Sequence, residues 1–184
     1  MNTSTSIAPA LRRLYFVRFA FAAVWAALLI PNGSDLKAIS VALLVLYPLF
    51  DAAAAVIDIR GSKAEAPARG LYINVAISLL AGIGLGAAAA SGIPAVLRVW
   101  GAWAIVSGII QLVMGLSRRA LGGQWPMIAS GAISTLAGTS FILQAGKANP
   151  SLTALGGYAL LGGLFFLGSA LRLGRGGKAQ PVEG

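Results

Sequence analysis

The sequence predicts an all-α, polytopic membrane protein with six transmembrane helices built as three repeated helical hairpins. Three observations carry this prediction: the composition, the lengths of the apolar segments and an internal repeat. Of the 184 residues, 58% are hydrophobic and only 10% are charged, with a mean hydropathy of +0.83. About a quarter of the residues in a soluble domain are charged. The composition therefore indicates an integral membrane protein.

The apolar residues gather into six segments, each long enough to cross about 30 Å of hydrocarbon as a helix. Short separators rich in Gly, Pro, Asn and Ser lie between most of them, as is typical of turns. The expected spans are residues 14–30, 38–57, 71–90, 95–116, 125–144 and 152–171. We expect residues 1–13 to form a cytoplasmic N-terminal segment, 14–171 the transmembrane domain and 172–184 a cytoplasmic tail.

The first apolar segment has the position of a signal peptide but not its pattern. Arg18 interrupts the apolar run, and no small-x-small cleavage site precedes a mature domain. We therefore interpret this segment as a retained span.

The basic residues predict the orientation of the six spans. An even number of spans places both termini on one side of the membrane, and most Lys and Arg residues then fall on that side. That face carries Arg12, Arg13, Arg60, Lys63, Arg69, Arg118, Arg119, Arg172, Arg175 and Lys178, and the other carries Lys37, Arg98 and Lys147. By the positive-inside rule both termini are cytoplasmic.

We expect the lipid bilayer as partner. We expect no nucleic acid as partner, because no basic stripe is interleaved with aromatic residues.

An internal repeat relates the even-numbered spans. An aromatic residue recurs at spacings of 56 and 55, and a small or polar residue follows it after one helical turn. The aromatic positions are Tyr47, Trp103 and Tyr158, and those that follow are Asp51, Ser107 and Gly162. The same offset places Arg18 opposite Asn74 and Ser130 in the odd spans. This pattern favours three parallel hairpin repeats, although chance matches among small apolar residues are the alternative.

Asp51 is the least expected residue of the chain, because it lies inside an apolar run. A carboxylate in the bilayer core costs about 2.5–3.5 kcal/mol on insertion scales, so it needs a partner or a task. Arg18, on the neighbouring span, is the first candidate partner, since a guanidinium can engage a carboxylate bidentately. Two alternatives remain open: Arg18 pairs with Asp58, two turns from Asp51, or it extends toward the cytoplasmic interface.

The repeat adds two further positions to this pair and defines a candidate intramembrane polar centre. Its members are Arg18, Asp51, Asp58, Asn74 and Ser107. One interpretation is structural, because a polar tie between helices stabilises membrane proteins by about 0.6 kcal/mol on average. The other is functional: the polar groups surround a site that passes or senses a proton or small ion.

The composition argues against an enzyme and against a resident metal or cofactor. The chain has no Cys and no His, which removes thiol nucleophiles, His-based triads and Cys/His metal sites. With Asp51 as the only deep carboxylate candidate, no nucleophile–base pair can be assembled. We therefore assign no catalytic, cofactor-binding or metal-binding residue.

The 24 glycines predict close helix packing. Gly82 and Gly86 form a small-xxx-small motif, and Gly108 and Gly115 lie on one helical face. Small residues let helix backbones approach where no hydrophobic force joins them. We expect this packing within one chain, with a homo-oligomer through Gly-rich helix faces as the alternative.

Two stretches resemble a known family. GAWAIVSGIIQLVMGLSRR (101–119) and QWPMIASGAISTLAGTSFI (124–142) are similar to the HdeD-like family of small bacterial membrane proteins. The shared pattern is an aromatic residue, a small-Gly pair and an apolar stretch closed by basic residues, here Trp103, Ser107-Gly108 and Arg118-Arg119.

The resemblance implies a six-helix protein of the bacterial plasma (inner) membrane and a link to acid resistance, but no catalytic residues. We expect a non-enzymatic, multi-pass protein of HdeD-like type that acts in acid stress or envelope homeostasis. The alternative is a small proton, ion or solute transporter or channel that uses the Arg18/Asp51 centre.

Overall fold

The computed structural model describes residues 7–61, 69–117 and 125–176, and within these ranges every regular element is a helix. Six helices are long and apolar enough to cross a membrane, which confirms the predicted all-α, polytopic class. The elements are α1 (Ile7–Leu29), the short 3-10 helix η2 (Ile30–Asn32), α2 (Ala38–Gly61), α3 (Arg69–Ala89), α4 (Ile93–Ser117), α5 (Trp125–Gln144) and α6 (Thr153–Gly176).

The first and last helices extend beyond the predicted spans. α1 begins at Ile7 and α6 ends at Gly176, whereas their membrane-compatible stretches are Arg12–Asn32 and Thr153–Arg172. Hydropathy detects only the part of a helix that suits hydrocarbon, while backbone hydrogen bonding continues into the polar flank. The domain boundaries expected beside residues 13 and 172 therefore lie inside these two helices.

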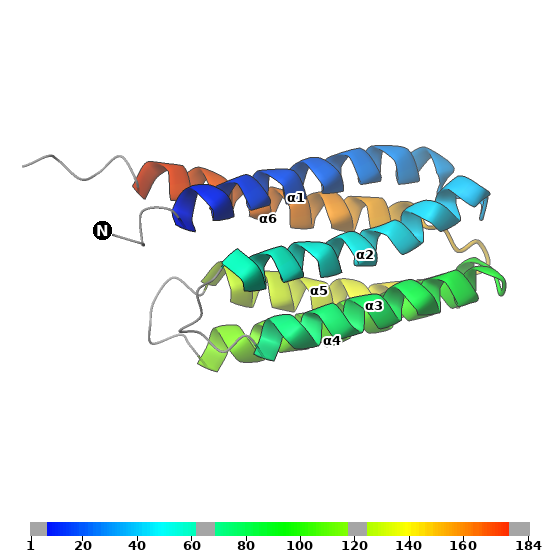
Figure 1. Cartoon of the computed structure of the whole chain (residues 1–184). Helices are drawn as coiled ribbons and strands as arrows, with labels where there is room; N and C mark the ends of the chain where they lie inside the picture. Colours follow the sequence, from blue (N-terminus) through cyan, green and yellow to red (C-terminus); the bar gives the residue numbers. More distant parts are fainter. Residues whose placement is uncertain (1–6, 62–68, 118–124, 177–184) are drawn as a thin grey trace, which may run out of the picture.

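The six helices run alternately up and down, so the bundle has two distinct ends (Figure 1). The start of α1 and the end of α6 lie together at one end, which we call the termini end. The turns 33–37, 90–92 and 145–152 lie at the other, which we call the loop end. Gly92 ends the α3–α4 turn with φ +89°, a left-handed conformation that glycine adopts without strain.

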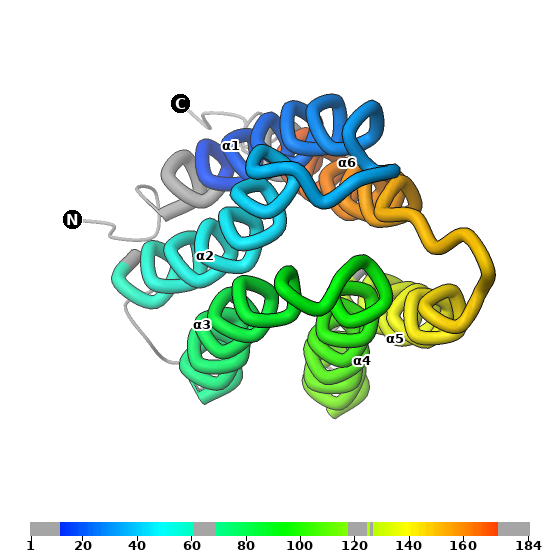
Figure 2. Tube along the Cα trace, turned by 90° about the vertical axis from the view of Figure 1, so that its right-hand side faces the viewer, coloured from blue at the N-terminus to red at the C-terminus, as the bar shows by residue number. Residues whose placement is uncertain are grey.

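The helices pack most closely as the pairs α1–α6, α2–α3 and α4–α5, while α1–α2 and α5–α6 touch much less. Figure 2 shows these three pairs arranged around a common axis. Each close pair joins helices from different predicted hairpins. Sequence neighbours through the loop-end turns are therefore the looser partners.

Glycines account for the close approach of α4 and α5. A Cβ added to Gly101 would lie 2.6 Å from the Gly138 carbonyl oxygen, and one added to Gly108 would lie 2.7 Å from the Gly131 oxygen. The reciprocal distances from Gly138 and Gly131 are 2.5 and 2.7 Å. At these positions a larger residue would push the backbones apart. The glycine seam (Gly101, Gly108, Gly131 and Gly138) is thus packed within the chain, as expected for Gly108.

The remaining glycines divide into packed and open positions. Gly82 packs against α2, where its added Cβ would lie 3.3 Å from Leu49 Cδ2, and one on Gly115 would lie 2.7 Å from Ile128 Cγ1 of α5. On α6, Gly157, Gly162 and Gly168 have nothing within 4 Å of such a Cβ. The predicted homo-oligomer contact stays a prediction, and these open α6 positions are where it would apply.

The large buried side chains lie in the loop-end half of the bundle. In the termini half, the buried hydrophobic residues of the described ranges are alanines and Leu14. The loop-end cluster consists of Trp25, Leu29, Leu43, Leu44, Leu85, Val96, Leu97, Trp100, Phe141, Ala145, Leu152, Leu155 and Ala159. The turns there also bind each other, since the Leu152 N–H donates to the Gly33 carbonyl at 2.9 Å. The bundle is therefore densely filled at the loop end and lined by small residues toward the termini end.

Two equivalent hydrogen bonds occur at positions that the proposed repeat relates. Trp103 Nε1 donates to Ser78 Oγ at 3.3 Å, and the Tyr158 hydroxyl donates to Ser134 Oγ at 2.9 Å. The two serines are 56 positions apart and the two aromatic residues 55. The matching position of the first hairpin is Ala22, which has no hydroxyl. The repeated hairpins remain a prediction, and these contacts agree with it.

Candidate functional site

Asp51 lies on α2 one turn after a proline that the helix accommodates. Pro48 is buried inside α2, and its missing N–H leaves the Leu44 carbonyl without its usual intrahelical donor. The alanines after Asp51 are small, and Ala52, Ala54 and Ala55 are all buried. This stretch lets neighbouring helices come close enough for their side chains to reach the carboxylate.

The predicted ion pair between Arg18 and Asp51 is present. Arg18 Nη2 donates to Asp51 Oδ1 at 2.7 Å. The side chains are 13% and 25% exposed, respectively, so neither is sealed inside the protein. The guanidinium carbon also lies 4.6 Å from the centre of the Phe166 ring on α6, within cation–π range. Arg18 is thus held by a carboxylate of α2 and an aromatic face of α6.

The second carboxylate oxygen is held by α3. Asn74 Nδ2 donates to Asp51 Oδ2 at 2.7 Å, and Ser78 Oγ donates to the same atom at 3.0 Å. Asn74 and Ser78 are one helical turn apart and therefore face the same way. Ser78 in turn accepts the Trp103 bond from α4. Asp51 is the hub of a hydrogen-bonded network that spans α1, α2, α3 and α4.

Of the five residues predicted for the polar centre, the structure brings three together. Arg18, Asp51 and Asn74 meet at the carboxylate. Ser107 does not join them: its Oγ is buried and has no hydrogen-bond partner among the described residues. It lies one turn from Trp103, and the network reaches α4 through that indole instead. Asp58 has interactions of its own, and its charge acts on Tyr15, as does that of Arg18.

Sequence reasoning missed Ser78 and Phe166 as members of the centre. The position of Ser78 one turn after Asn74 was a usable signal, because both residues share a helical face. No such signal existed for Phe166. Its contact with Arg18 depends on the packing of the first helix against the last.

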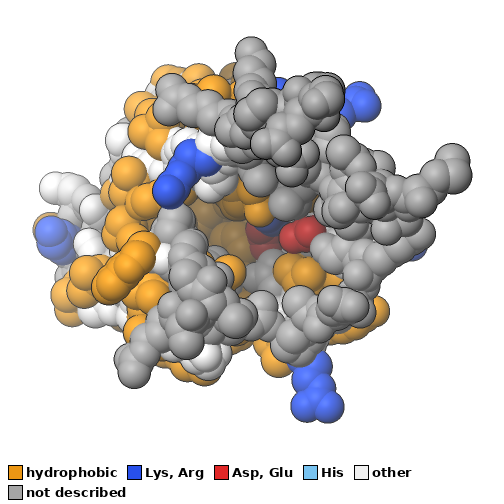
Figure 3. All heavy atoms as spheres, turned by 90° about the vertical axis from the view of Figure 1, so that its left-hand side faces the viewer, with side chains coloured by type: hydrophobic (Ala, Val, Ile, Leu, Met, Phe, Trp, Pro, Cys, Tyr) orange, Lys and Arg blue, Asp and Glu red, His pale blue; other side chains and the backbone are white. Residues whose placement is uncertain are grey.

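The termini end of the bundle is hollowed. Figure 3 views that end and shows a hollow in the middle of the face, with acidic side chains at its floor and hydrophobic side chains around them. The partial exposure of Asp51 agrees with this view. The hollow gives a small solute a path toward acidic side chains from the termini end.

An aromatic cluster closes the other side of the centre. Trp25 and Trp100 stack with ring centres 5.4 Å apart, and Tyr47 contacts Trp25, Trp100 and Trp103 at 4.7, 5.5 and 6.2 Å. Trp25 Nε1 donates to the Leu43 carbonyl at 2.6 Å, which ties α1 to α2. Trp100 is fully buried, and its Nε1 has no partner within the described ranges. These rings belong to the buried cluster that fills the bundle toward the loop end.

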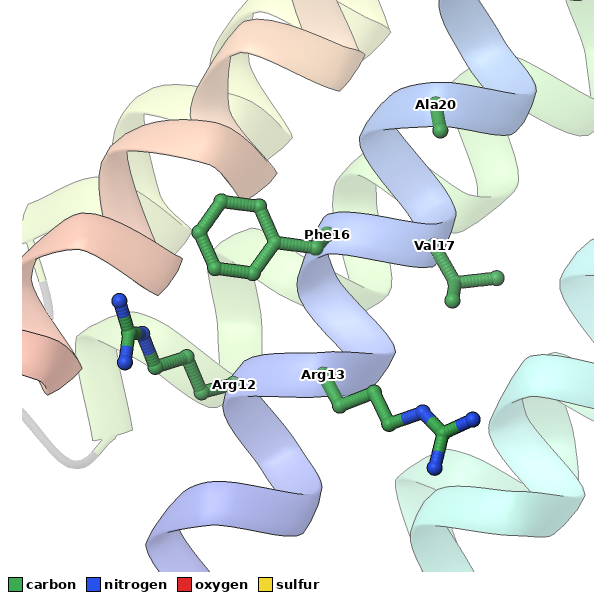
Figure 4. Close-up of a pocket in the computed structure, with 5 residues that line it drawn as sticks. All are labelled: Arg12, Arg13, Phe16, Val17 and Ala20. Atoms are coloured by element: carbon green, nitrogen blue, oxygen red, sulfur yellow. The ribbon is translucent and has the colours of Figure 1, made fainter.

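A shallow recess on the outer face of α1 carries two further arginines. It is lined by Arg12, Arg13, Phe16, Val17 and Ala20 (Figure 4). The two guanidinium groups point away from each other, and that of Arg12 lies 5.4 Å from the Phe16 ring centre. Their charges do not converge on one point. Exposed arginines beside apolar side chains are typical of a membrane interface. The side of the membrane that this interface faces stays a prediction.

The described part of the chain contains no group of three or more Asp, Glu, His or Cys residues that could hold a metal ion. The centre does offer a carboxylate that can accept about four hydrogen bonds, and three of these come from Arg18, Asn74 and Ser78.

Comparison with models of known protein families, with curated proteins and with solved structures finds no match for this chain.

Proposed function

We propose that this integral membrane protein binds a proton, ion or small polar solute at the Arg18/Asp51 centre and moves it across the membrane, as a small transporter or channel. The observation that supports this proposal is the Asp51 carboxylate, whose side chain remains 25% exposed inside the bundle. The termini end of that bundle is hollowed, with acidic side chains within the hollow (Figure 3). A charged group that a solute can reach from one end of a bundle is what a transport protein needs in one of its states.

The position of the Asp51 carboxylate favours a role in binding or transport over a purely structural role. An ionisable group in the membrane interior is costly, and a tie between helices is cheaper to build from amides and hydroxyls. A quarter of the Asp51 side chain also remains exposed, so the network does not enclose the carboxylate fully between the helices.

The proposed activity is non-enzymatic. The partners of Asp51 are a guanidinium, an amide and a hydroxyl, and the chain has no Cys or His to act as nucleophile or shuttle. These groups bind and orient a solute but do not form a nucleophile–base pair. We assign no cofactor.

We further propose that the protein lies in the bacterial inner membrane with both termini in the cytoplasm. The excess of Lys and Arg on the termini side supports this orientation. The hollow then faces the cytoplasm.

The test is flux into reconstituted vesicles, measured with a pH dye for protons and by tracer uptake for monovalent ions and small solutes. We expect flux above that of protein-free vesicles and its loss in Asp51→Asn, which keeps the size of the side chain but removes the charge. Asp35→Asn is the matched control, because Asp35 is 66% exposed in a loop-end turn, 3.6 Å from Lys37. Wild-type vesicles without flux, or an Asp51→Asn variant with full flux, would contradict the proposal.

A second function is favoured by the three hydrogen bonds that Asp51 accepts. Both carboxylate oxygens accept hydrogen bonds, and the network ties α1, α2 and α3. In this case the centre is structural and the chain is an HdeD-like protein of acid stress or envelope homeostasis. The resemblance of residues 101–119 and 124–142 to that family supports this alternative.

Thermal unfolding in detergent separates the two roles. Arg18→Leu leaves a carboxylate without its cation and should cost about 3 kcal/mol. A buried pair can often be replaced by apolar side chains without loss, so for a functional centre we expect the Arg18→Leu/Asp51→Leu double variant to unfold near the wild-type temperature. If the double variant unfolds as early as the single one, the network is primarily a structural tie, and acid survival of cells that carry it becomes the relevant assay.

A further inference from the structure

The Arg18 side chain occupies what is, in chemical terms, a complete site for a planar organic cation. One side is the Asp51 carboxylate, 2.7 Å from the guanidinium nitrogen, and the other is the Phe166 ring, 4.6 Å from the guanidinium carbon. The Tyr15 ring extends this aromatic side, with its centre 5.6 Å from that of Phe166. A carboxylate facing an aromatic surface is the combination that recognises guanidinium and related cations.

The donors of α3 orient this site. Asn74 and Ser78 both bind Asp51 Oδ2, which leaves Oδ1 to face the cation. The arrangement suits a hard metal ion poorly, because such ions need six or more oxygen ligands. A planar cation needs only one carboxylate edge and a ring face.

The site lies where two closely packed helix pairs meet. Arg18 and Phe166 belong to the pair α1–α6, and Asp51 and Asn74 belong to α2–α3. Between α1 and α2, contacts toward the loop end include the Trp25–Leu43 bond and the stacked rings of Phe21 and Phe50, 3.7 Å apart. At the polar centre the Arg18–Asp51 bond joins these pairs. Exchange of this bond would loosen the contact between the pairs at the polar centre, while the contacts toward the loop end remain.

We propose that Arg18 is a tethered stand-in for the substrate, and that a small organic cation of the guanidinium class replaces its side chain on Asp51. This inference rests on the proposed function and names the substrate class of the same site. The incoming cation enters through the hollow, binds Asp51 Oδ1 and lies on Phe166. The displaced guanidinium moves toward the termini end, the direction in which α1 side chains lean and in which Asp58 lies seven residues beyond Asp51.

The test is chemical rescue of a variant that lacks the tethered cation. In Arg18→Ala the site keeps its carboxylate and ring but has no resident guanidinium. We expect ethylguanidinium at low millimolar concentration to raise the unfolding temperature of this variant in detergent. At ten times its Kd the ligand should favour the folded state about tenfold. Wild type should respond only at higher concentration, because its own Arg18 competes.

Two controls make the response specific. The Arg18→Ala/Asp51→Asn double variant lacks the carboxylate and should show no shift with ethylguanidinium. Ethylammonium chloride at equal concentration has the same charge without the planar fork, and it should stabilise Arg18→Ala less. An equal shift in the double variant, or no shift in Arg18→Ala, would overturn the inference.

If Arg18→Ala yields no folded protein in plain buffer, extraction in the presence of ethylguanidinium replaces the melting experiment. Recovery of folded protein supports the site, and failure to recover it counts against it. The outcome is separable from that of the flux assay. Rescue without flux leaves a cation-binding site that does not transport, whereas flux without rescue retains the transporter and rejects this substrate class.

Discussion

At the scale of single residues, two serines on neighbouring helices have buried hydroxyl groups with opposite surroundings. Ser78 Oγ donates to Asp51 and accepts from Trp103, so it links the carboxylate to α4. Ser107 Oγ is buried without a partner in the described structure. A buried hydroxyl stabilises a protein only when it is hydrogen-bonded. The sequence pattern assigned Ser107 to the centre, but local geometry gives that position to Ser78.

This contrast predicts opposite effects for the same substitution. Ser78→Ala should lower stability by about 1 kcal/mol, because it removes two hydrogen bonds and leaves the Trp103 N–H unpaired. Ser107→Ala should leave stability unchanged or raise it slightly, because it removes an unpaired polar group. Thermal unfolding of both variants in detergent measures the difference. An equal loss in both would show that Ser107 has a partner, such as a bound water.

At the scale of helices, the close pairs are set by small residues rather than by loop connections. The glycine seam brings the backbones of α4 and α5 into contact, and Gly82 packs on Leu49 of α2. Lipid is as apolar as a helix surface, so helices in a membrane associate through packing and hydrogen bonds. Where the backbones can approach, packing is strongest.

The glycine seam predicts that replacing a glycine by alanine destabilises the protein at some positions and not at others. Gly138→Ala places a Cβ 2.5 Å from the Gly101 oxygen and 2.9 Å from the Ile105 nitrogen, so the helices must separate. Overpacking of this kind costs about 1–3 kcal/mol. Gly168→Ala is the matched control: nothing lies within 4 Å of its Cβ, and stability should hold or rise by less than about 1 kcal/mol. Chemical unfolding in mixed micelles compares the two, and equal stability would argue against a close α4–α5 seam.

At the scale of the whole molecule, the bundle is asymmetric along its axis. Aromatic and aliphatic side chains fill the loop end, while alanines and the polar centre line the termini half. Among the described residues, more Lys and Arg lie near the termini end than near the loop end: Arg12, Arg13, Arg60, Arg69, Arg172 and Arg175 against Lys37, Arg98 and Lys147. Access to Asp51 is therefore coupled to the orientation of the protein in the membrane.

The orientation can be measured directly because the chain has no cysteine. We expect single cysteines at Asp35 and Lys147 to react with a membrane-impermeant maleimide in intact spheroplasts. Cysteines at Arg69 and Ser117 should react only after permeabilisation, because the positive-inside rule places this end in the cytoplasm. The reverse labelling pattern would turn the hollow, and the proposed uptake, toward the opposite side.

The sequence alone determined the helical class and the six spans, because hydropathy and helical spacing act locally. It also made Arg18 the first candidate partner of Asp51, because a charge in an apolar run needs a partner, but the choice between Asp51, Asp58 and the interface came from the structure. Tertiary structure decided which helices pack closely, the place of Ser78 and Phe166 beside the pair, and the hollow at the termini end. These features depend on contacts between helices far apart in the chain. The helices are built largely from Ala, Gly and Leu, so many different helix pairs would present similar sequence patterns. Only the fit of the assembled side chains distinguishes the pairs that form.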